Sequence, residues 1–209
     1  MTFTRCHLLM DNTYIGGMIM DFLGKIHEKE IQQKEEKIKA LDDGTVKGLI
    51  LSGNYYNIGS TVIVQVNSNE LLYASSNDYE FTEYIKDIST YGFTWKDVDE
   101  YISNVVTVCR RKVKKDKILI CSLLDTYFER MSGQAFTNEK IYAFDDGKLQ
   151  YIITYDEIDD ADFEEDAVIL KLTGGQEIRL YCDESGQGSR YSKNLFNFIM
   201  DIKDRLDEQ

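Results

Sequence analysis

The sequence predicts an α+β protein, in which a mixed, helix-rich N-terminal domain precedes an antiparallel β-barrel capped by a C-terminal α-helix. Two observations lead to this prediction. Apolar residues change to a period of two after Lys117 and keep it up to Cys182, as successive strands do. The period then becomes helical again in a last amphipathic segment that ends in Lys203 and Arg205.

In the N-terminal half, residues 17–41 contain no helix breaker after Gly24 and predict one long helix whose middle is charged and solvated. Two short apolar runs follow, Val46–Leu51 and Thr61–Val66. They are strands or the ends of buried helices, because periodicity does not separate these cases for short runs.

A second helix is expected over 95–110, since Thr94 can cap it and Asp97 stands at its third position. The basic strip 110–117 follows, with six bases among eight residues. We interpret it as a hinge that docks on the chain's own acids; contact with nucleic acid or phospholipid is the other hypothesis.

Six strands are predicted after this strip, separated by turn signals such as Asp145-Asp146-Gly147 and Gly174-Gly175. A final helix is capped by Ser192 and has an apolar face that includes Leu195, Phe198 and Ile202. The strand candidates are Ile118–Cys121, Ala135–Thr137, Ile141–Phe144, Leu149–Ile153, Val168–Leu172 and Ile178–Cys182.

The segments Gly133–Tyr142 and Leu149–Ile158, with the closing helix, resemble the bacterial pleckstrin-homology-like (PH-like) domains over about residues 114–207. The resemblance implies a binding or assembly module without catalytic residues. Eukaryotic members bind inositol phosphates through bases around the first hairpin, whereas residues 123–131 here hold one base and two acids. We therefore expect a PH-like domain at 114–209 and, at 1–110, a mixed α/β domain of no recognised family.

The densest chemical feature is an acidic segment with eight carboxylates among eleven residues. Its spacing does not fit a calcium loop, so we interpret it as a solvated loop or a surface for a partner that presents Lys or Arg. The candidate partner-binding residues are Asp156, Glu157, Asp159, Asp160, Asp162, Glu164, Glu165 and Asp166.

Catalytic, cofactor and metal sites are not predicted. The segment Gly53–Thr61 lacks the lysine of a phosphate loop, and only two histidines are present, His7 and His27. The cysteines are far apart, and three of them lie in apolar periodic runs as expected of buried residues. Aromatic residues gather in the irregular stretch from Tyr55 to Trp95, where they serve either a partner interface or the core.

Composition limits the partners. The formal net charge of −13 opposes nucleic acid and anionic membranes, and the sequence has neither a spanning apolar run nor a signal-peptide pattern. We expect a cytoplasmic, non-enzymatic bacterial or phage protein that binds a protein partner with a basic surface or associates with itself. The alternative is an acidic phage-type inhibitor, involved in defence or counter-defence, that mimics phosphates toward a nucleic-acid-binding enzyme.

Overall fold

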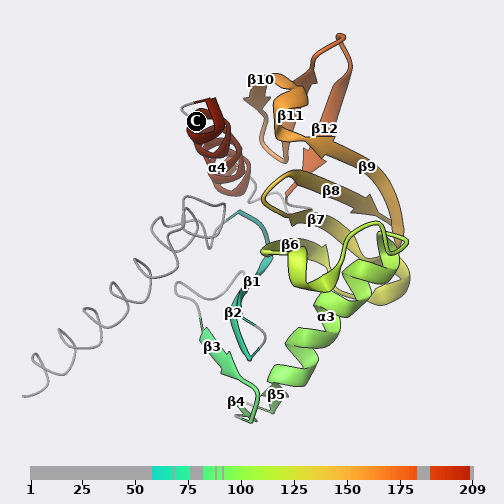
Figure 1. Ribbon diagram of the computed structural model, residues 1–209, viewed down its shortest axis with the longest axis vertical. Coiled ribbons are helices and arrows are strands. Elements are labelled where there is room, and N and C mark those ends of the chain that lie inside the picture. Colours follow the sequence, from blue (N-terminus) through green and yellow to red (C-terminus); the bar gives the residue numbers. More distant parts are fainter. Residues whose placement is uncertain are drawn as a thin grey trace, which may run out of the picture. The chain divides into compact units, whose positions relative to one another are not determined.

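The computed structural model describes residues 58–67, 69–75, 82–87, 89–90, 92–182 and 189–207. In this part of the chain it shows antiparallel sheets and two α-helices (Figure 1), so the α+β class is confirmed. The helix expected over 17–41 and the apolar run Val46–Leu51 lie outside the described residues.

Seven strands form the larger sheet, in the spatial order β3-β2-β1-β6-β7-β8-β9. Every neighbouring pair is antiparallel. Apolar and β-branched residues fill its central strands because both faces of the sheet are covered. The strands are β1 (Thr61–Asn67), β2 (Glu70–Ser75), β3 (Thr82–Ile85), β6 (Ile120–Asp125), β7 (Ser132–Phe136), β8 (Lys140–Asp145) and β9 (Lys148–Thr154).

Three further strands form a second sheet in the order β10-β11-β12, namely β10 (Ile158–Phe163), β11 (Ala167–Leu172) and β12 (Glu177–Tyr181). Two short strands, β4 (Ser89–Thr90) and β5 (Phe93–Thr94), pair beside the start of the first described helix. All six predicted strands after the basic strip are present.

Strand β10 corrects the prediction of an acidic loop. Ile158 and Ala161 are buried, while the residues between and after them are exposed. A register shift between Ile158 and Asp160 changes the spacing of the buried residues from two to three, so the sequence does not show the alternation of a regular strand.

The hairpin turns follow the residues that the sequence singles out. Asp146 and Gly147 have φ values of 47° and 66°, as required at both central positions of the tight turn between β8 and β9. Gly174 and Gly175 take φ values of 112° and 83° between β11 and β12. In the turn between β7 and β8, the Thr137 hydroxyl accepts hydrogen bonds from the backbone N–H groups of Glu139 and Lys140.

Helix α3 (Trp95–Val108) begins where the sequence predicts. The carboxylate of Asp97 accepts hydrogen bonds from the backbone N–H and the hydroxyl of Thr94, and these bonds lower the pKa of Asp97. The helix stops two residues before the predicted end, where Arg110 and Arg111 follow with φ values of 54° and 57°.

Helix α4 (Ser189–Asp207) begins three residues before the predicted cap. Ser192 is therefore a buried helical residue, and its hydroxyl donates to the backbone carbonyl of Glu165 rather than capping the helix. The predicted apolar face is confirmed at Leu195, Phe198, Ile199 and Ile202, which are all buried.

A hydrophobic cluster lies on each face of the larger sheet. One contains α4, the second sheet and residues of β1, β6, β7 and β8, and Phe136 stacks edge-on against Phe198 in it. The other contains residues of α3. Tyr84 and Phe93 belong to the second cluster with Tyr73 and Tyr101, so the described aromatics of the Tyr55–Trp95 stretch serve the core.

The expected boundary at residues 110–114 lies inside one unit, which runs from Leu41 to Gln209. Strand β1 pairs with β2 on one side and with β6 on the other, so the larger sheet continues across the expected boundary. Among the described residues before α3 we find strands β1 to β5 and no helix, so the helix-rich character expected of residues 1–110 is not supported there. The physical reason is that β1 has buried residues on both faces, and the backbone N–H and C=O groups of a strand inside the core need partner strands along both edges, here β2 and β6.

No helix among the described residues is both long and apolar enough to cross a membrane.

Candidate functional site

The eight predicted acidic residues do not form one loop. Asp156 and Glu157 lie in a turn of 3₁₀-helix (Tyr155–Glu157), the next three lie on β10, and the last three connect β10 to β11. Glu157 accepts a hydrogen bond from the backbone N–H of Thr154 at 2.9 Å, which lowers its pKa. It therefore stabilises a turn.

Three of these acids are paired with bases of the same chain. Asp160 lies 3.0 Å from Lys171 of β11, and this bond lowers the pKa of Asp160. Arg179 of β12 contacts both Glu164 and Asp166. The other five of the eight acids, Asp156, Glu157, Asp159, Asp162 and Glu165, form no ion pair with a described residue.

The basic strip 110–117 docks on an acid of α3 in one place. Lys115 lies 2.6 Å from the Asp99 carboxylate and also donates to the Ser103 hydroxyl. A cavity of about 390 Å³ lies between this strip and the β7–β8 turn, lined by Lys112, Lys114, Lys117 and Lys140 together with Asp116 and Glu139. The Lys115 contact agrees with the interpretation of a strip that docks on the chain's own acids.

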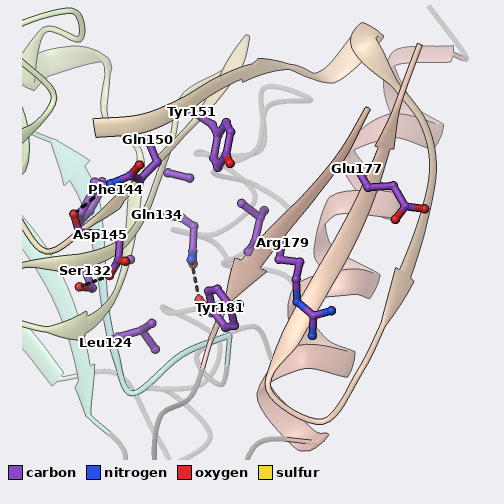
Figure 2. A pocket seen from close by; sticks show the side chains of 13 residues that line it. Leu124, Ser132, Gln134, Phe144, Asp145, Gln150, Tyr151, Glu177, Arg179 and Tyr181 are labelled. Carbon is purple, nitrogen blue, oxygen red and sulfur yellow. Dashed lines mark hydrogen bonds between the residues drawn. The ribbon is translucent and has the colours of Figure 1, made fainter. Parts of the chain in front are cut away.

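A second cavity of about 360 Å³ lies between the larger sheet and β12 (Figure 2). Its wall on the larger sheet is a cross-strand row, in which Gln134 of β7 neighbours Ala143 of β8, and Ala143 neighbours Tyr151 of β9. The opposite wall consists of Glu177, Arg179, Leu180 and Tyr181 of β12. This volume falls at the lower end of the roughly 300–1,000 Å³ that is typical of ligand pockets.

Gln134 is the most informative residue of this pocket. Its side chain is only 3% exposed, and Nε2 donates a hydrogen bond of 2.6 Å to the backbone carbonyl of Tyr181 (Figure 2). The other amide atom, Oε1, is buried and has no hydrogen-bond partner. The amide cannot be reversed without placing two oxygens against each other, so the unpartnered atom is an acceptor that needs a donor.

The free edge of β12 lies beside Gln134. Cys182 donates to Asp166 O, and Leu172 donates to Gln176 O, so the backbone groups of Ile178 and Leu180 point toward β11. Those of Glu177, Arg179 and Tyr181 then point the other way. Among the described residues, the carbonyl of Tyr181 has Gln134 as a partner, whereas the N–H of Tyr181 and both backbone groups of Arg179 have none.

Gly133 sets the shape of the wall next to Gln134. It has a φ of 143°, and a Cβ atom at this position would lie 2.1 Å from the backbone oxygen of Ser122. Only glycine allows this approach of β7 to β6.

Asp145 is a carboxylate that lines this pocket. Asp145 accepts a hydrogen bond from the Ser132 hydroxyl at 2.8 Å, but the described residues include no group of His, Cys, Asp and Glu side chains that could hold a metal ion. The described cysteines, Cys109, Cys121 and Cys182, are buried free thiols, and burial raises the pKa of Cys109 to about 12. The pocket offers hydrogen bonds, aromatic rings and charge, which are the means of binding.

No protein-family model matches this chain, and no curated protein is significantly similar to it in sequence.

The sequence interpretation missed the pocket because Gln134 reads as an ordinary polar residue of an alternating strand. One signal was present. Gln134 shares its strand face with Phe136, which lies in the core between the two sheets. A polar residue on the inward face of a predicted strand should therefore be examined as a candidate site.

Proposed function

We propose that this chain is a non-enzymatic, cytoplasmic protein-binding module of the PH-like class, from a bacterium or a phage, and that its partner occupies the pocket beside β12. The order of elements supports the PH-like assignment. Four antiparallel strands, β6 to β9, are followed by three more, β10 to β12, and then by helix α4, which packs on the second sheet.

The observation that supports a binding role is the unpartnered acceptor of Gln134. A buried oxygen without a donor costs about 1–3 kcal/mol, and an apolar side chain of similar shape would avoid this cost. A partner that brings a donor to Oε1 removes the penalty when it binds. Residues that cost stability in the free protein are typical of functional sites.

The acidic residues have two roles in this proposal. Those on β10 protect an edge strand, because charged side chains discourage pairing with the strand of another molecule. Asp156, Asp159, Asp162 and Glu165, which have no ion pair among the described residues, attract a basic partner over longer distances and raise its association rate.

The alternative, a phosphate mimic that inhibits a nucleic-acid-binding enzyme, needs carboxylates that are free to meet the enzyme's cations. Asp160, Glu164 and Asp166 already pair with Lys171 or Arg179. The geometry therefore supports this alternative less well than it supports the pocket.

The test begins with capture of the partner from host lysate on the tagged full chain and its identification by mass spectrometry. The purified partner is then titrated against the wild type, Gln134→Leu and a control, Gln65→Leu. Gln65 is a strand glutamine of β1 that donates to Lys115 O and does not line the pocket. If the partner is a second copy of the chain, light scattering replaces the titration.

We expect Gln134→Leu to weaken binding at least tenfold, which corresponds to about 1.4 kcal/mol, while Gln65→Leu binds like the wild type. Equal affinity of all three would show that the pocket is not the binding site. A chain that captures nothing and is monomeric in light scattering would refute the protein-binding function itself. Asp159→Asn with Asp162→Asn should slow association and reduce its salt dependence.

A further inference from the structure

We infer that the partner enters the pocket as an extended, basic polypeptide segment that pairs with the free edge of β12. This inference rests on the proposed function and adds the form and chemistry of the ligand.

The edge of β12 offers a pattern that only another backbone matches well. The N–H and C=O groups of Arg179 and the N–H of Tyr181 face away from β11 and have no partner in the described part of the chain. They recur at every second residue, so they are about 7 Å apart along the strand. An added strand would satisfy them all, as in the strand-addition mode of peptide recognition.

Gln134 continues this pattern beyond the edge. Its Nε2 donates a hydrogen bond to the carbonyl of Tyr181, and its Oε1 is a buried, unpartnered acceptor in the residue that forms this part of the pocket wall. The carboxamide thus uses the carbonyl of Tyr181 and provides Oε1 as an acceptor in its place. This oxygen requires one hydrogen-bond donor from the ligand. A backbone N–H of the incoming strand, or a donor on its side chain, fits this requirement.

The two outer edges of the second sheet differ in the features that block pairing with another strand. The β10 edge has Asp159, Asp160 and Asp162 exposed on it and a register irregularity, which are devices that block pairing. Strand β12 has no register irregularity against β11. Its exposed side chains are those of Glu177, Arg179 and Tyr181, and Arg179 is already paired with Glu164 and Asp166.

The residues at the rim of the pocket indicate which ligand side chains would fit there. Tyr151 and Tyr181 flank it and are 40% and 48% exposed, which suits an apolar residue between two rings. Asp145 and Glu177 add two carboxylates, while the charge of Arg179 is balanced by Glu164 and Asp166. The preferred segment therefore combines apolar residues with Lys or Arg.

The probe for this inference is a random peptide display library selected on the full-length chain and counter-selected on Gln134→Leu. The strongest peptide is synthesised with a single N-methyl group on each backbone nitrogen in turn. We expect selected peptides rich in Lys, Arg and β-branched residues. N-methylation should reduce affinity at least tenfold at every second position and little at the positions between, because only alternate N–H groups face β12.

A matched pair of variants tests the same edge from the side of the protein. Arg179→Pro removes an N–H that is not used in the β11–β12 ladder, and Arg179→Ala keeps that N–H while removing the same guanidinium. We expect Arg179→Pro to abolish peptide binding and Arg179→Ala to retain it. The N-methyl series uses the unaltered protein, so its result holds even if Arg179→Pro fails to fold.

The outcomes separate this inference from the proposed function. Suppose that Gln134→Leu no longer binds the partner, but that the effect of N-methylation on peptide affinity shows no period of two. This result would support the pocket as the binding site and would refute strand addition. Failure to enrich any peptide over the Gln134→Leu counter-selection would also overturn it. A period of two that Arg179→Pro does not affect would place the peptide on another strand edge and would equally refute pairing with β12.

Discussion

The Gln134→Leu substitution should leave the free energy of unfolding almost unchanged or raise it, although it alters a buried residue in the middle of β7. The expectation follows from the two halves of the carboxamide. Nε2 makes one hydrogen bond, to the carbonyl of Tyr181, whereas Oε1 is buried without a partner. Leucine has a similar size and removes both atoms.

Loss of the hydrogen bond costs about 0.5–1.5 kcal/mol when water takes the place of Nε2 at the carbonyl of Tyr181, a residue that is 48% exposed. Removal of the unpartnered oxygen stabilises the variant by about 1–3 kcal/mol. The net change is then about −0.5 to +2.5 kcal/mol in favour of the variant. For a chain of this size, 1 kcal/mol corresponds to about 2–4 °C in melting temperature. The variant should therefore melt no more than about 2 °C below the wild type, while its affinity for the partner falls.

Urea unfolding followed by circular dichroism measures this difference. Gln65→Leu is the control, because Gln65 donates to Lys115 O at 3.3 Å and its side chain has no buried, unpartnered atom. It should lose about 0.5–1.5 kcal/mol. A loss of more than about 2 kcal/mol in Gln134→Leu would show that Gln134 serves packing and would remove the main support for the pocket.

Three further predictions concern the fold. Tyr155→Phe should cost about 1–3 kcal/mol in urea unfolding, because the buried Tyr155 hydroxyl donates to Thr137 O at 3.0 Å. The unfolding free energy should hold above pH 4.5 and fall as the pH drops below that value, because the pKa of Asp97, Glu157 and Asp160 lies below the ordinary 3.8 or 4.5 in the folded state and their stabilisation is lost on protonation. Cys109, Cys121 and Cys182 should remain unlabelled by a maleimide in the native chain and become labelled in urea, as read by peptide mass spectrometry.

Each of these has a clear contrary result. A cost below about 0.5 kcal/mol for Tyr155→Phe would mean that its hydroxyl does not link the β7–β8 turn to the segment before β10. Stability that rises on acidification below pH 4.5 would contradict the lowered carboxyl pKa values. Native labelling of the three cysteines at the rate of an exposed thiol would contradict their burial.

Local chemistry made part of this fold predictable. The start of α3 follows from Thr94 and Asp97, whose side chains and backbone groups bond to each other without help from distant residues. The β8–β9 hairpin follows from Asp146 and Gly147, which accept positive φ values. The apolar face of α4 was likewise visible in its helical spacing.

Non-local pairing was not predictable in the same way. The sequence leaves Thr61–Val66 open between a strand and the end of a buried helix, and nothing local indicates that β1 pairs with β6, so the larger sheet across the 110–114 boundary was missed. On β10, the charged residues and the register irregularity interrupt the alternation of a regular strand, so the sequence does not show that Ile158 and Ala161 point inward. The pocket forms because the backbone of β12 contacts Gln134, which lies far from β12 in the sequence. No residue spacing in the sequence indicates this contact.

Amide hydrogen exchange on the full chain, followed by NMR with and without the selected peptide, tests the β12 pocket as a binding site most directly. In the free chain, the amides of Ile178 and Leu180 should be protected and those of Arg179 and Tyr181 should exchange rapidly, since only the first pair is bonded to β11. Peptide binding should protect Arg179 and Tyr181 at least tenfold. Exchange at these two amides that stays fast in the bound chain would contradict a ligand at this edge.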